Sequence, residues 1–326
     1  MKILITGGAG YIGSILTEKC LEAGDEVIVY DNLSTGHREA VPAGAALVVG
    51  DVADPGLMTA TLRKSRVEAV VHMAGFIEAG ESMIDPGKYF RNNCCRPVEL
   101  LEAMVSAGVD RLLFSSTAAV YGNPRTEFLD EGHPQAPTNA YGQSKLFFEQ
   151  MLDWYERIHG IRHAALRYFN AAGATPERGE DHRPETHLIP LVLKTALGQR
   201  QRIEIYGTDY ATPDGTCVRD YIHIADLAQA HLLALRGLGA ESMHYNLGNG
   251  KGYSVREVID TAREVTGRDF AVRESARRPG DPAVLVASSK RIESELGWRQ
   301  GYPELKTIVA SAWEWHQRHP GGYGGS

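Results

Sequence analysis

A glycine-rich loop between an apolar run and a helix-length segment constrains the fold of this chain most. The loop, Gly7-Gly8-Ala9-Gly10-Tyr11-Ile12-Gly13, follows the strand-like run Lys2–Thr6 and opens the helical segment Ile12–Ala23. Glycines at the first, fourth and seventh positions permit a tight turn, close approach of the backbone to a pyrophosphate, and close packing of helix on strand. The loop therefore predicts a strand–loop–helix unit that binds a dinucleotide.

The first half of the chain alternates short β-rich runs with helix-length segments. The strand-like runs are Lys2–Thr6, Glu26–Asp31, Ala46–Val49, Ala69–His72, Arg111–Ser115 and Ala164–Tyr168. The helical segments are Ile12–Ala23, Gly56–Lys64, Pro97–Ala107 and Asn139–Ile158. Buried strands separated by helices indicate a parallel sheet covered on both faces. We predict an α/β fold with a doubly wound, Rossmann-type parallel sheet as the cofactor-binding domain, residues 1–170.

The composition and the periodicity of the sequence change after Asn170. Residues Ala171–His187 are rich in Gly, Pro and charge and show no periodicity, which predicts a long loop that binds substrate. Helical patches and short strands follow, and they predict a smaller C-terminal α/β substrate domain over residues 171–320. Elements near residues 215–250 are expected to return to the first sheet. Residues 321–326, GGYGGS, are expected to form a flexible tail.

An acidic residue at the end of the second strand-like run indicates which dinucleotide binds. Asp31 stands where an acid accepts hydrogen bonds from the adenosine ribose hydroxyls and repels a 2′-phosphate. Asp51 and Val52 follow the third run, where an adenine ring would lie. These positions predict NAD, rather than NADP, as the cofactor.

A tyrosine and a lysine four residues apart suggest acid–base chemistry. Tyr141 and Lys145 lie on one face of a predicted helix, and a nearby ammonium group is expected to lower the pKa of the phenol. A tyrosine in that setting can act as a general base. The spacing alone is weak evidence, because Tyr302 and Lys306 repeat it. The run Ser115-Ser116-Thr117 at the end of the fifth strand supports the first pair, since ligands bind at that edge of such sheets.

These motifs together resemble a known superfamily. The glycine loop, the run SSTAAVYG from Ser115 and the Tyr141–Lys145 pair resemble the extended short-chain dehydrogenases/reductases. Five further runs resemble the UDP-glucose 4-epimerase family within it: RYFN from Arg167, PETHLIP from Pro184, VRDYIH from Val218, YNLG from Tyr245 and RRPGDP from Arg277. The resemblance covers nearly the whole chain. It implies NAD-dependent interconversion of UDP-galactose and UDP-glucose by transient oxidation at C4, through a 4-keto intermediate.

The resemblance also implies a role for each matching residue. Tyr141 would be the base, Lys145 would hold the nicotinamide ribose and tune Tyr141, and Thr117 would bridge to the substrate hydroxyl. The other expected NAD-binding residues are Gly7, Gly10, Tyr11, Ile12, Gly13, Asp31, Asn32, Ser34, Thr35, Gly36, Asp51, Val52, Met73, Ala74, Gly75, Asn92, Ser115, Tyr168 and Phe169.

The same resemblance assigns the UDP-sugar site. Diphosphate and sugar would contact Asn170, Arg219 and Arg278, and the uridine would contact Asp281 and Tyr206. The further expected substrate-binding residues are Thr117, His187, Leu188 and Leu285. Leu285 stands at the position that lines the pocket beside the C2 substituent of the sugar in this family, although its apolar surroundings also suit a strand in the core.

Three positions depart from the family pattern. Thr117 replaces a frequent serine, Ile77 replaces a lysine that contacts phosphate, and His187 stands where some members carry asparagine. His182 and His187 lie among acidic residues, but no helical or Cys/His spacing supports a metal site there. The sequence therefore predicts no metal.

Three other functions remain open on the sequence, and one of them is a dehydrogenase that releases NADH. A nucleotide-sugar 4,6-dehydratase needs an acid after the bridging hydroxyl, and Ala118 and Ala119 occupy those positions instead. A non-catalytic NAD-binding regulator would have no need to keep Thr117, Tyr141 and Lys145 together.

The composition of the 326-residue chain narrows the possible partners. Its formal net charge of −7 offers no basic face for nucleic acid or an anionic membrane. Its apolar runs fall short of the roughly 18–20 residues that span a bilayer, and we expect no secretory leader. The four cysteines form no C-x-x-C motif, which favours reduced thiols. We expect a cytoplasmic homodimer that acts on a UDP-sugar.

Overall fold

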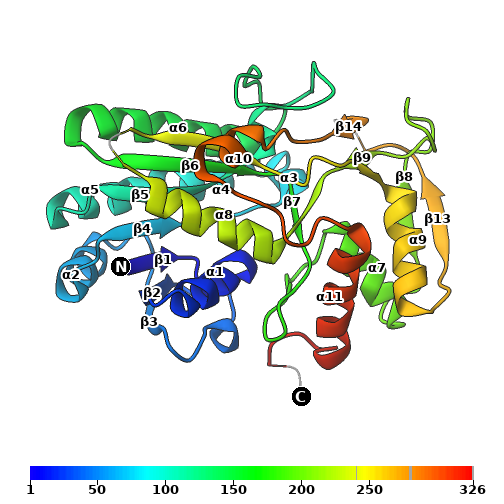
Figure 1. Cartoon of the computed structure of the whole chain (residues 1–326), viewed down its shortest axis with the longest axis horizontal. Coiled ribbons are helices and arrows are strands. Elements are labelled where there is room, and N and C mark those ends of the chain that lie inside the picture. Colours follow the sequence, from blue (N-terminus) through cyan, green and yellow to red (C-terminus); the bar gives the residue numbers. More distant parts are fainter. Residues whose placement is uncertain (240, 279–280, 325–326) are drawn as a thin grey trace. The chain divides into compact units, whose positions relative to one another are not determined.

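A seven-stranded sheet in the order β11-β6-β5-β4-β1-β2-β3 organises the N-terminal part of the computed structural model (Figure 1). Its strands are β1 (Lys2–Thr6), β2 (Glu26–Asp31), β3 (Ala46–Val49), β4 (Ala69–His72), β5 (Arg111–Thr117), β6 (Arg162–Tyr168) and β11 (Met243–Leu247). The pairs from β6 across to β3 are parallel. The order reverses between β1 and β4, which is the switch point where such sheets bind nucleotides. The predicted doubly wound sheet is therefore confirmed.

The structure describes residues 1–239, 241–278 and 281–324. Contacts divide the chain into two units. Unit 1 contains Met1–Asn123, Glu131–Tyr168 and Ala228–Tyr245, and unit 2 contains Pro124–Asp130, Phe169–Leu227 and the chain from Asn246 onward.

The helical elements before residue 160 largely cover the sheet. They are α1 (Tyr11–Glu22), η1 (Arg38–Ala40), α2 (Pro55–Ser65), α3 (Ala79–Ser82), α4 (Pro86–Phe90), η2 (Arg91–Cys95), α5 (Arg96–Ala107), η3 (Ala118–Val120) and α6 (Ala140–His159). Helices α2, α5 and α6 share one buried core with alternate strand residues such as Leu4, Leu112 and Phe114. The neighbours Ile3 and Ile5 are also fully buried, because successive strand residues face opposite sides of a sheet.

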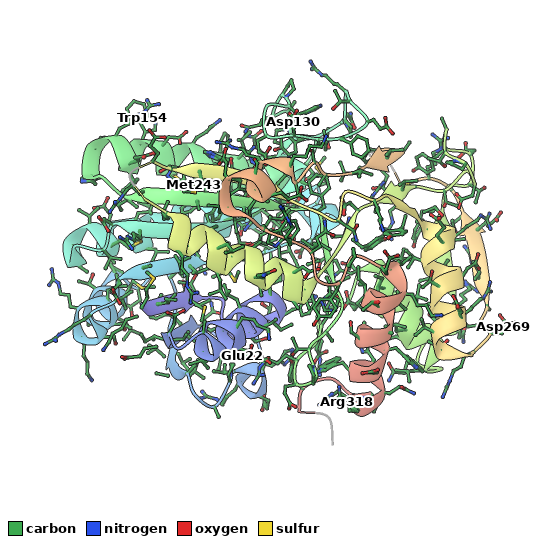
Figure 2. All side chains as sticks on the ribbon, in the orientation of Figure 1. Glu22, Asp130, Trp154, Met243, Asp269 and Arg318 are labelled. Atoms are coloured by element: carbon green, nitrogen blue, oxygen red, sulfur yellow. The ribbon has the colours of Figure 1, made fainter. Side chains whose placement is uncertain are left out.

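Helix α6 is the longest helix that the described residues form, and its outer face is partly apolar. Asn139 caps its N-terminus by accepting a hydrogen bond from the Gly142 amide at 2.8 Å. Phe148 and Leu152 bury one face of the helix in the core. Trp154 projects from the opposite side with 60% of its surface exposed (Figure 2). No helix of the described chain is long and apolar enough to cross a membrane.

Unit 2 is built around helices α7, α9 and α11. The elements of unit 2 are β7 (Asn170–Ala172), α7 (Leu188–Ala196), β8 (Ile203–Tyr206), β9 (Val218–Arg219), β10 (Tyr221–His223), β12 (Tyr253–Ser254), α9 (Val255–Thr266), β13 (Val272–Ser275), β14 (Val284–Leu285), α10 (Lys290–Leu296) and α11 (Leu305–Arg318). Helix α8 (Ile224–Gly237) begins in unit 2 and lies mostly in unit 1. Three small sheets accompany them, in the orders β10-β7, β12-β9-β14 and β13-β8. Residues of α7, α9 and α11 pack with strand β8 into a second core.

Three details differ from the sequence-based expectations. Strand β5 continues two residues further, to Thr117, and β6 begins two residues earlier, at Arg162. The segment expected to be a loop from Ala171 opens with strand β7, because Asn170–Ala172 pairs in parallel with Tyr221–His223. The segment expected to be a flexible tail contains Tyr323, which is only 9% exposed and whose amide donates to Asp181 at 3.0 Å. The last two residues of that segment lie outside the described part.

Candidate active site

The glycine loop leaves no room for side chains at two of its positions. Gly7 has φ of +71°, and a Cβ there would lie 2.7 Å from the Ala74 amide nitrogen. A Cβ at Gly13 would lie 2.3 Å from the Gly7 carbonyl oxygen. Both distances are shorter than real Cβ contacts, so only glycine lets the loop, the start of α1 and the end of β4 approach this closely.

The N-terminus of α1 is open to an anion. Gly10 precedes the helix, and within the described chain no side chain caps this end and no acidic residue lies in its first turn. The amides of the first helical turn, at Tyr11, Ile12 and Gly13, carry the partial positive charge of the helix dipole. An uncapped N-terminus beside a glycine cradle fits the pyrophosphate of a dinucleotide.

Asp31 lies at the end of β2 and organises the surrounding loops. One carboxylate oxygen accepts a hydrogen bond from the Ala9 amide at 3.0 Å, and the other accepts one from the Leu33 amide at 2.8 Å. The side chain is therefore held beside the glycine loop, and its oxygens keep further lone pairs for ribose hydroxyls. Its negative charge is that expected of an NAD site.

The other residues expected near adenosine gather at the ends of β2 and β3. Asn32 donates to the Asp51 carboxylate at 3.1 Å, and the Ser34 amide donates to the Asn32 side chain at 3.0 Å. A Cβ on Gly36 would lie 3.0 Å from Ala9, so the loop after β2 touches the glycine loop. Thr35 and Val52 lie in these same two loops, and Thr35 is exposed.

Tyr141, Lys145 and Thr117 come together at the ends of α6 and β5. The Thr117 hydroxyl lies close enough to Tyr141 to act on the pKa of its phenol, and its oxygen accepts a hydrogen bond from the Ala119 amide at 3.1 Å. Lys145 Nζ donates to the Ser115 carbonyl at 2.8 Å and lies 4.9 Å from the centre of the Phe114 ring. Both polar groups of α6 are thus tied to the same end of one strand.

The electrostatics of this group differ from the sequence-based expectation. Burial raises the pKa of Tyr141 above its ordinary value, against the opposing effect of the nearby Thr117 hydroxyl. Burial also lowers the pKa of Lys145, to about 8. The expectation that Lys145 lowers the pKa of Tyr141 is therefore wrong for the chain alone. The physical reason is that both groups lose water, and the ammonium is directed at a carbonyl oxygen of β5.

Residues that follow β4 form a second wall near Lys145. A Cβ on Gly75 would lie 3.3 Å from Lys145 Nζ and 3.2 Å from Asn93 Oδ1, so the backbone of Gly75 lies against both side chains. Asn93 is 3% exposed and bonds both backbone groups of Phe76 and the Ser144 hydroxyl. Asn92 donates to the Asn93 side chain at 3.0 Å.

Sequence reasoning selected Asn92 and missed the buried Asn93. Both asparagines lie in η2, a π-helical turn between α4 and α5, a feature that often marks functional sites. The periodicity of an ordinary helix does not reveal which side chain such a turn buries.

Tyr168 and Phe169, the two remaining NAD candidates, belong to different units. The Tyr168 hydroxyl is hydrogen-bonded to His231 within unit 1, and burial raises its pKa. The Phe169 amide donates to the Leu247 carbonyl at 3.1 Å within unit 2.

Unit 2 contains a cavity of about 630 Å³, and most of the predicted substrate-binding residues line it. Seven of the nine predicted substrate-binding residues line it: Asn170, His187, Leu188, Tyr206, Arg219, Arg278 and Asp281. Its volume suits a nucleotide-sized ligand. Sequence analysis missed Arg200, Arg202, Cys217 and Tyr221, which also line the cavity. Only their place in the tertiary structure identifies them.

Arginines supply the positive charge of this cavity. The Arg219 guanidinium donates to the Pro282 carbonyl at 2.8 Å and lies 3.6 Å from the Asp281 carboxylate. The Arg278 guanidinium lies over the Tyr206 ring, 3.9 Å from its centre. Fixed guanidinium groups of this kind suit phosphate oxygens.

The two remaining substrate candidates do not occur among the described residues that line the cavity. Thr117 belongs to unit 1. Leu285 lies in β14, where its register partner in β9 is Arg219. Its proposed contact with the sugar stays a prediction.

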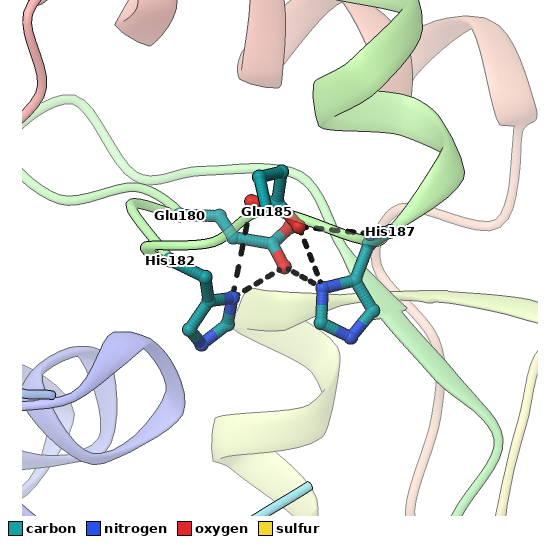
Figure 3. A group of neighbouring side chains, drawn as sticks. All are labelled: Glu180, His182, Glu185 and His187. Carbon is teal, nitrogen blue, oxygen red and sulfur yellow. Dashed lines mark hydrogen bonds and ion pairs between the residues drawn. The ribbon is translucent and has the colours of Figure 1, made fainter. Parts of the chain in front are cut away.

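Four charged side chains converge in the loop before α7, although the sequence predicted no metal there. They are Glu180, His182, Glu185 and His187 (Figure 3). Asp181 is engaged elsewhere, by Arg183 at 2.9 Å and by the Tyr323 amide.

Comparisons with known proteins agree with this geometry. Residues 3–248 match the NAD dependent epimerase/dehydratase family. The UDP-glucose 4-epimerase of Streptomyces lividans is 51% identical over 324 residues, 99% of this chain and 98% of that protein.

Solved structures agree as well. A UDP-glucose 4-epimerase crystal structure matches with a TM-score of 0.97 and 49% identity over all of both chains. The enzyme from Bifidobacterium longum, in complex with NAD+ and UDP, matches with a TM-score of 0.94 and 36% identity over 99% of this chain and 100% of that one. The resemblance noted in the sequence is confirmed, and the chain belongs to the NAD dependent epimerase/dehydratase family.

Proposed function

We propose that this chain interconverts UDP-galactose and UDP-glucose by reversible oxidation at C4 of the sugar. One observation carries the proposal: Thr117 and Tyr141 lie together beside a buried Lys145, in a chain 51% identical to a UDP-glucose 4-epimerase over nearly its whole length. Inversion at C4 needs a group that accepts and returns the proton of one hydroxyl, and this arrangement provides it.

The cofactor site is proposed on the glycine cradle. The open N-terminus of α1 would hold the pyrophosphate, and Asp31 would bind the adenosine ribose. Lys145 would hold the nicotinamide ribose. When bound, NAD supplies the two-electron acceptor for oxidation at C4 and a positive charge that favours ionisation of Tyr141.

The proton path runs through two hydroxyl groups of this chain. Tyr141, once ionised, would take the proton of the 4-hydroxyl group, directly or through Thr117. The Ala119 amide donates to the Thr117 oxygen, so the Thr117 proton would be available to pass between the substrate and Tyr141. The same groups would return the proton after the 4-keto sugar has turned over in the site. Because the electrons also return to the sugar, the reaction has no net redox change.

The UDP portion is proposed to bind in the unit 2 cavity. Arg219, Arg278 and Asn170 would hold the diphosphate and sugar, and Tyr206 and Asp281 would contact the uridine. The B. longum enzyme with NAD+ and UDP supports a uridine nucleotide as the ligand.

The family also contains dehydratases, and the residues after Thr117 argue against that chemistry here. Elimination across C5 and C6 needs an acid and a base beside the bridging hydroxyl. Ala118 and Ala119 occupy the turn η3 at these positions, and neither carries a titratable group.

A homodimer is proposed through α5 and α6. Phe147, Trp154 and Ile158 recur at helical spacing on α6, with 44, 60 and 66% of their surfaces exposed. An apolar stripe of this kind suits a second copy of the chain. We also propose that the protein lies in the cytoplasm, because the sequence favours reduced cysteines.

A coupled assay tests the activity directly. The protein is supplied with UDP-galactose, and formation of UDP-glucose is followed with an enzyme that consumes only UDP-glucose. Turnover without net formation of NADH supports the proposal. A product that has lost water, or an absence of UDP-glucose, contradicts it.

A further inference from the structure

The strongest unassigned feature of the molecule is the group formed by Glu180, His182, Glu185 and His187 (Figure 3). All four residues belong to unit 2, and the loop that carries them runs to the start of α7. The imidazole Nδ1 atoms of both histidines face the two carboxylates. Glu180 Oε1 lies 3.1 Å from His182 Nδ1 and 2.8 Å from His187 Nδ1.

We propose that these four side chains form a tetrahedral site for a divalent cation of the zinc class, which fixes the loop beside the unit 2 cavity. The proposed ligand atoms are Glu180 Oε1, Glu185 Oε2 and the two Nδ1 atoms of His182 and His187. The proposal does not depend on the reaction that the protein catalyses.

The distances between these atoms suit a tetrahedral ion. Zinc–nitrogen and zinc–oxygen bonds of about 2.1 Å place neighbouring ligand atoms roughly 3.4 Å apart. The observed distances lie on both sides of that value, from 2.8 Å between Glu180 and His187 to 3.9 Å between Glu185 Oε2 and His182. All candidate ligand atoms lie within 4.8 Å of one another.

An unpartnered oxygen atom provides a second, independent observation. Glu185 Oε1 accepts hydrogen bonds from the amides of Thr186 and His187, both at 2.8 Å. Glu185 Oε2 is buried and has no hydrogen-bond partner among the described residues. Only 4% of the Glu185 side chain is exposed. A carboxylate oxygen this buried is costly unless a proton donor or a metal ion meets it.

The charge of the group also suits a divalent cation. Two carboxylates and two neutral imidazoles neutralise a doubly charged ion, so the buried group as a whole carries no net charge. Mixed nitrogen and oxygen ligands favour zinc over calcium or magnesium, which prefer oxygen alone. His187 keeps 42% of its side chain exposed and lines the cavity, which provides a path of entry.

Protons are the competitors of the ion. Despite burial, contact with Glu180 raises the pKa of both His182 and His187. Without an ion the two imidazolium groups would balance the two carboxylates, and zinc would displace two protons. His316 on α11 is the further titratable group near the cluster, since the charges of Glu180 and Glu185 act on it together with those of Lys194 and Asp181. The affinity for zinc should therefore rise with pH.

The experiment uses the full-length protein without a histidine tag, stripped with a chelator and titrated with zinc sulfate or cobalt chloride. We expect one ion per chain by calorimetry, and the intense visible absorption of tetrahedral Co²⁺. Glu180→Gln and His182→Gln should each weaken zinc binding by about 100-fold or more. Glu177→Gln, an exposed carboxylate of the same loop, is the matched control and should bind like wild type.

Two results would overturn the site. One is the absence of stoichiometric zinc binding to the wild-type protein, which requires no variant to fold. The other is wild-type affinity in a folded Glu180→Gln variant, because the ion would then bind elsewhere. Neither measurement uses epimerase activity, so failure here and failure of the proposed function are distinguishable.

Discussion

Tyr141 and Lys145, one helical turn apart on α6, are both tied to β5, at positions two residues apart. Lys145 Nζ donates to the Ser115 carbonyl at 2.8 Å, and the Tyr141 phenol lies within the influence of the Thr117 hydroxyl. This connection fixes the phenol and the ammonium group relative to one strand end. Because burial raises the pKa of Tyr141 and lowers that of Lys145, the ligand-free chain holds the tyrosine as a neutral phenol. Ionisation must await further positive charge.

Replacement of the phenol tests its role as general base. Tyr141→Phe should lower kcat by about 10²- to 10⁴-fold while binding of NAD and UDP persists, because only the proton acceptor is removed. Steady-state kinetics and equilibrium binding measure both. The control is Tyr302→Phe, the other tyrosine with a lysine four residues later, whose ring contacts His223. If Tyr141→Phe keeps more than about a tenth of the wild-type kcat, Tyr141 is not the base.

The choice of cofactor tests Asp31. Purified protein should release NAD on denaturation, with little NADP, because the carboxylate repels a 2′-phosphate. Asp31→Asn should reduce the preference for NAD over NADP by about tenfold or more, a difference of roughly 1.4 kcal/mol. Chromatography of the released nucleotide and competition binding provide the measurements. Recovery of mainly NADP from the wild-type protein would contradict this assignment.

Removal of one partner of the buried pair Glu149–Arg167 should destabilise unit 1. Arg167 Nη2 lies 2.6 Å from Glu149 Oε2. Only 4% of the Glu149 side chain and 3% of the Arg167 side chain is exposed. Glu149→Leu should lower the free energy of unfolding by about 3–5 kcal/mol, because it leaves a buried guanidinium group unpaired. Denaturant titration measures the loss.

Two matched variants check this explanation. Glu156 lies on the same helix, but 31% of its side chain is exposed. Glu156→Leu should therefore lower the free energy of unfolding far less than Glu149→Leu does. The double variant Glu149→Leu/Arg167→Met should recover part of the loss, since no unpaired charge remains. If the double variant instead loses the sum of the free energies of unfolding lost by the two single variants, lost packing and not an unpaired charge causes the destabilisation.

His72 should make the protein less stable in acid. Burial lowers its pKa from the ordinary 6.5 to about 3, and its Nδ1 lies 2.7 Å from the Thr6 hydroxyl. Between these values the unfolded chain binds a proton that the folded chain does not, so stability falls as the pH falls. From pH 7 to pH 5 this one histidine should reduce the free energy of unfolding by about 2 kcal/mol.

Denaturant titrations at both pH values measure this effect. His72→Gln should lose that part of the pH dependence, whatever its stability at pH 7. The exposed His159→Gln should retain the wild-type dependence. An identical pH dependence in wild type and His72→Gln would show that other groups cause the acid effect.

Substrate scope tests Leu285. If this side chain borders the C2 substituent, the protein should prefer UDP-glucose and UDP-galactose and turn over UDP-N-acetylglucosamine weakly. Leu285→Ser should raise relative kcat/KM for the acetylated sugar by about 10- to 200-fold, and Leu285→Tyr should abolish that activity. If the ratio of kcat/KM between the two kinds of sugar is unchanged in both variants, Leu285 is only a strand residue, as the pairing of β14 with β9 also allows.

The local features of unit 1 were predictable from the sequence because each depends on neighbours along the chain. Strands β1 to β4 match their predicted bounds, and the glycine loop follows β1 where expected. The short period of apolar residues and the absence of a Cβ in glycine act over a few residues, so they can be read directly.

Long-range contacts decided the rest. The burial of Asn93 depends on a π-helical turn, the raised pKa of Tyr141 on water excluded by several elements, and the cavity walls at Cys217 and Tyr221 on the packing of unit 2. The group around Glu180 and His187 has no regular spacing, since an irregular loop brings its members together. The sequence determined which chemical groups the chain has and where its strands and helices form. Only the tertiary structure decided which groups lose water and which meet, because desolvation and charge contact are properties of distance in space.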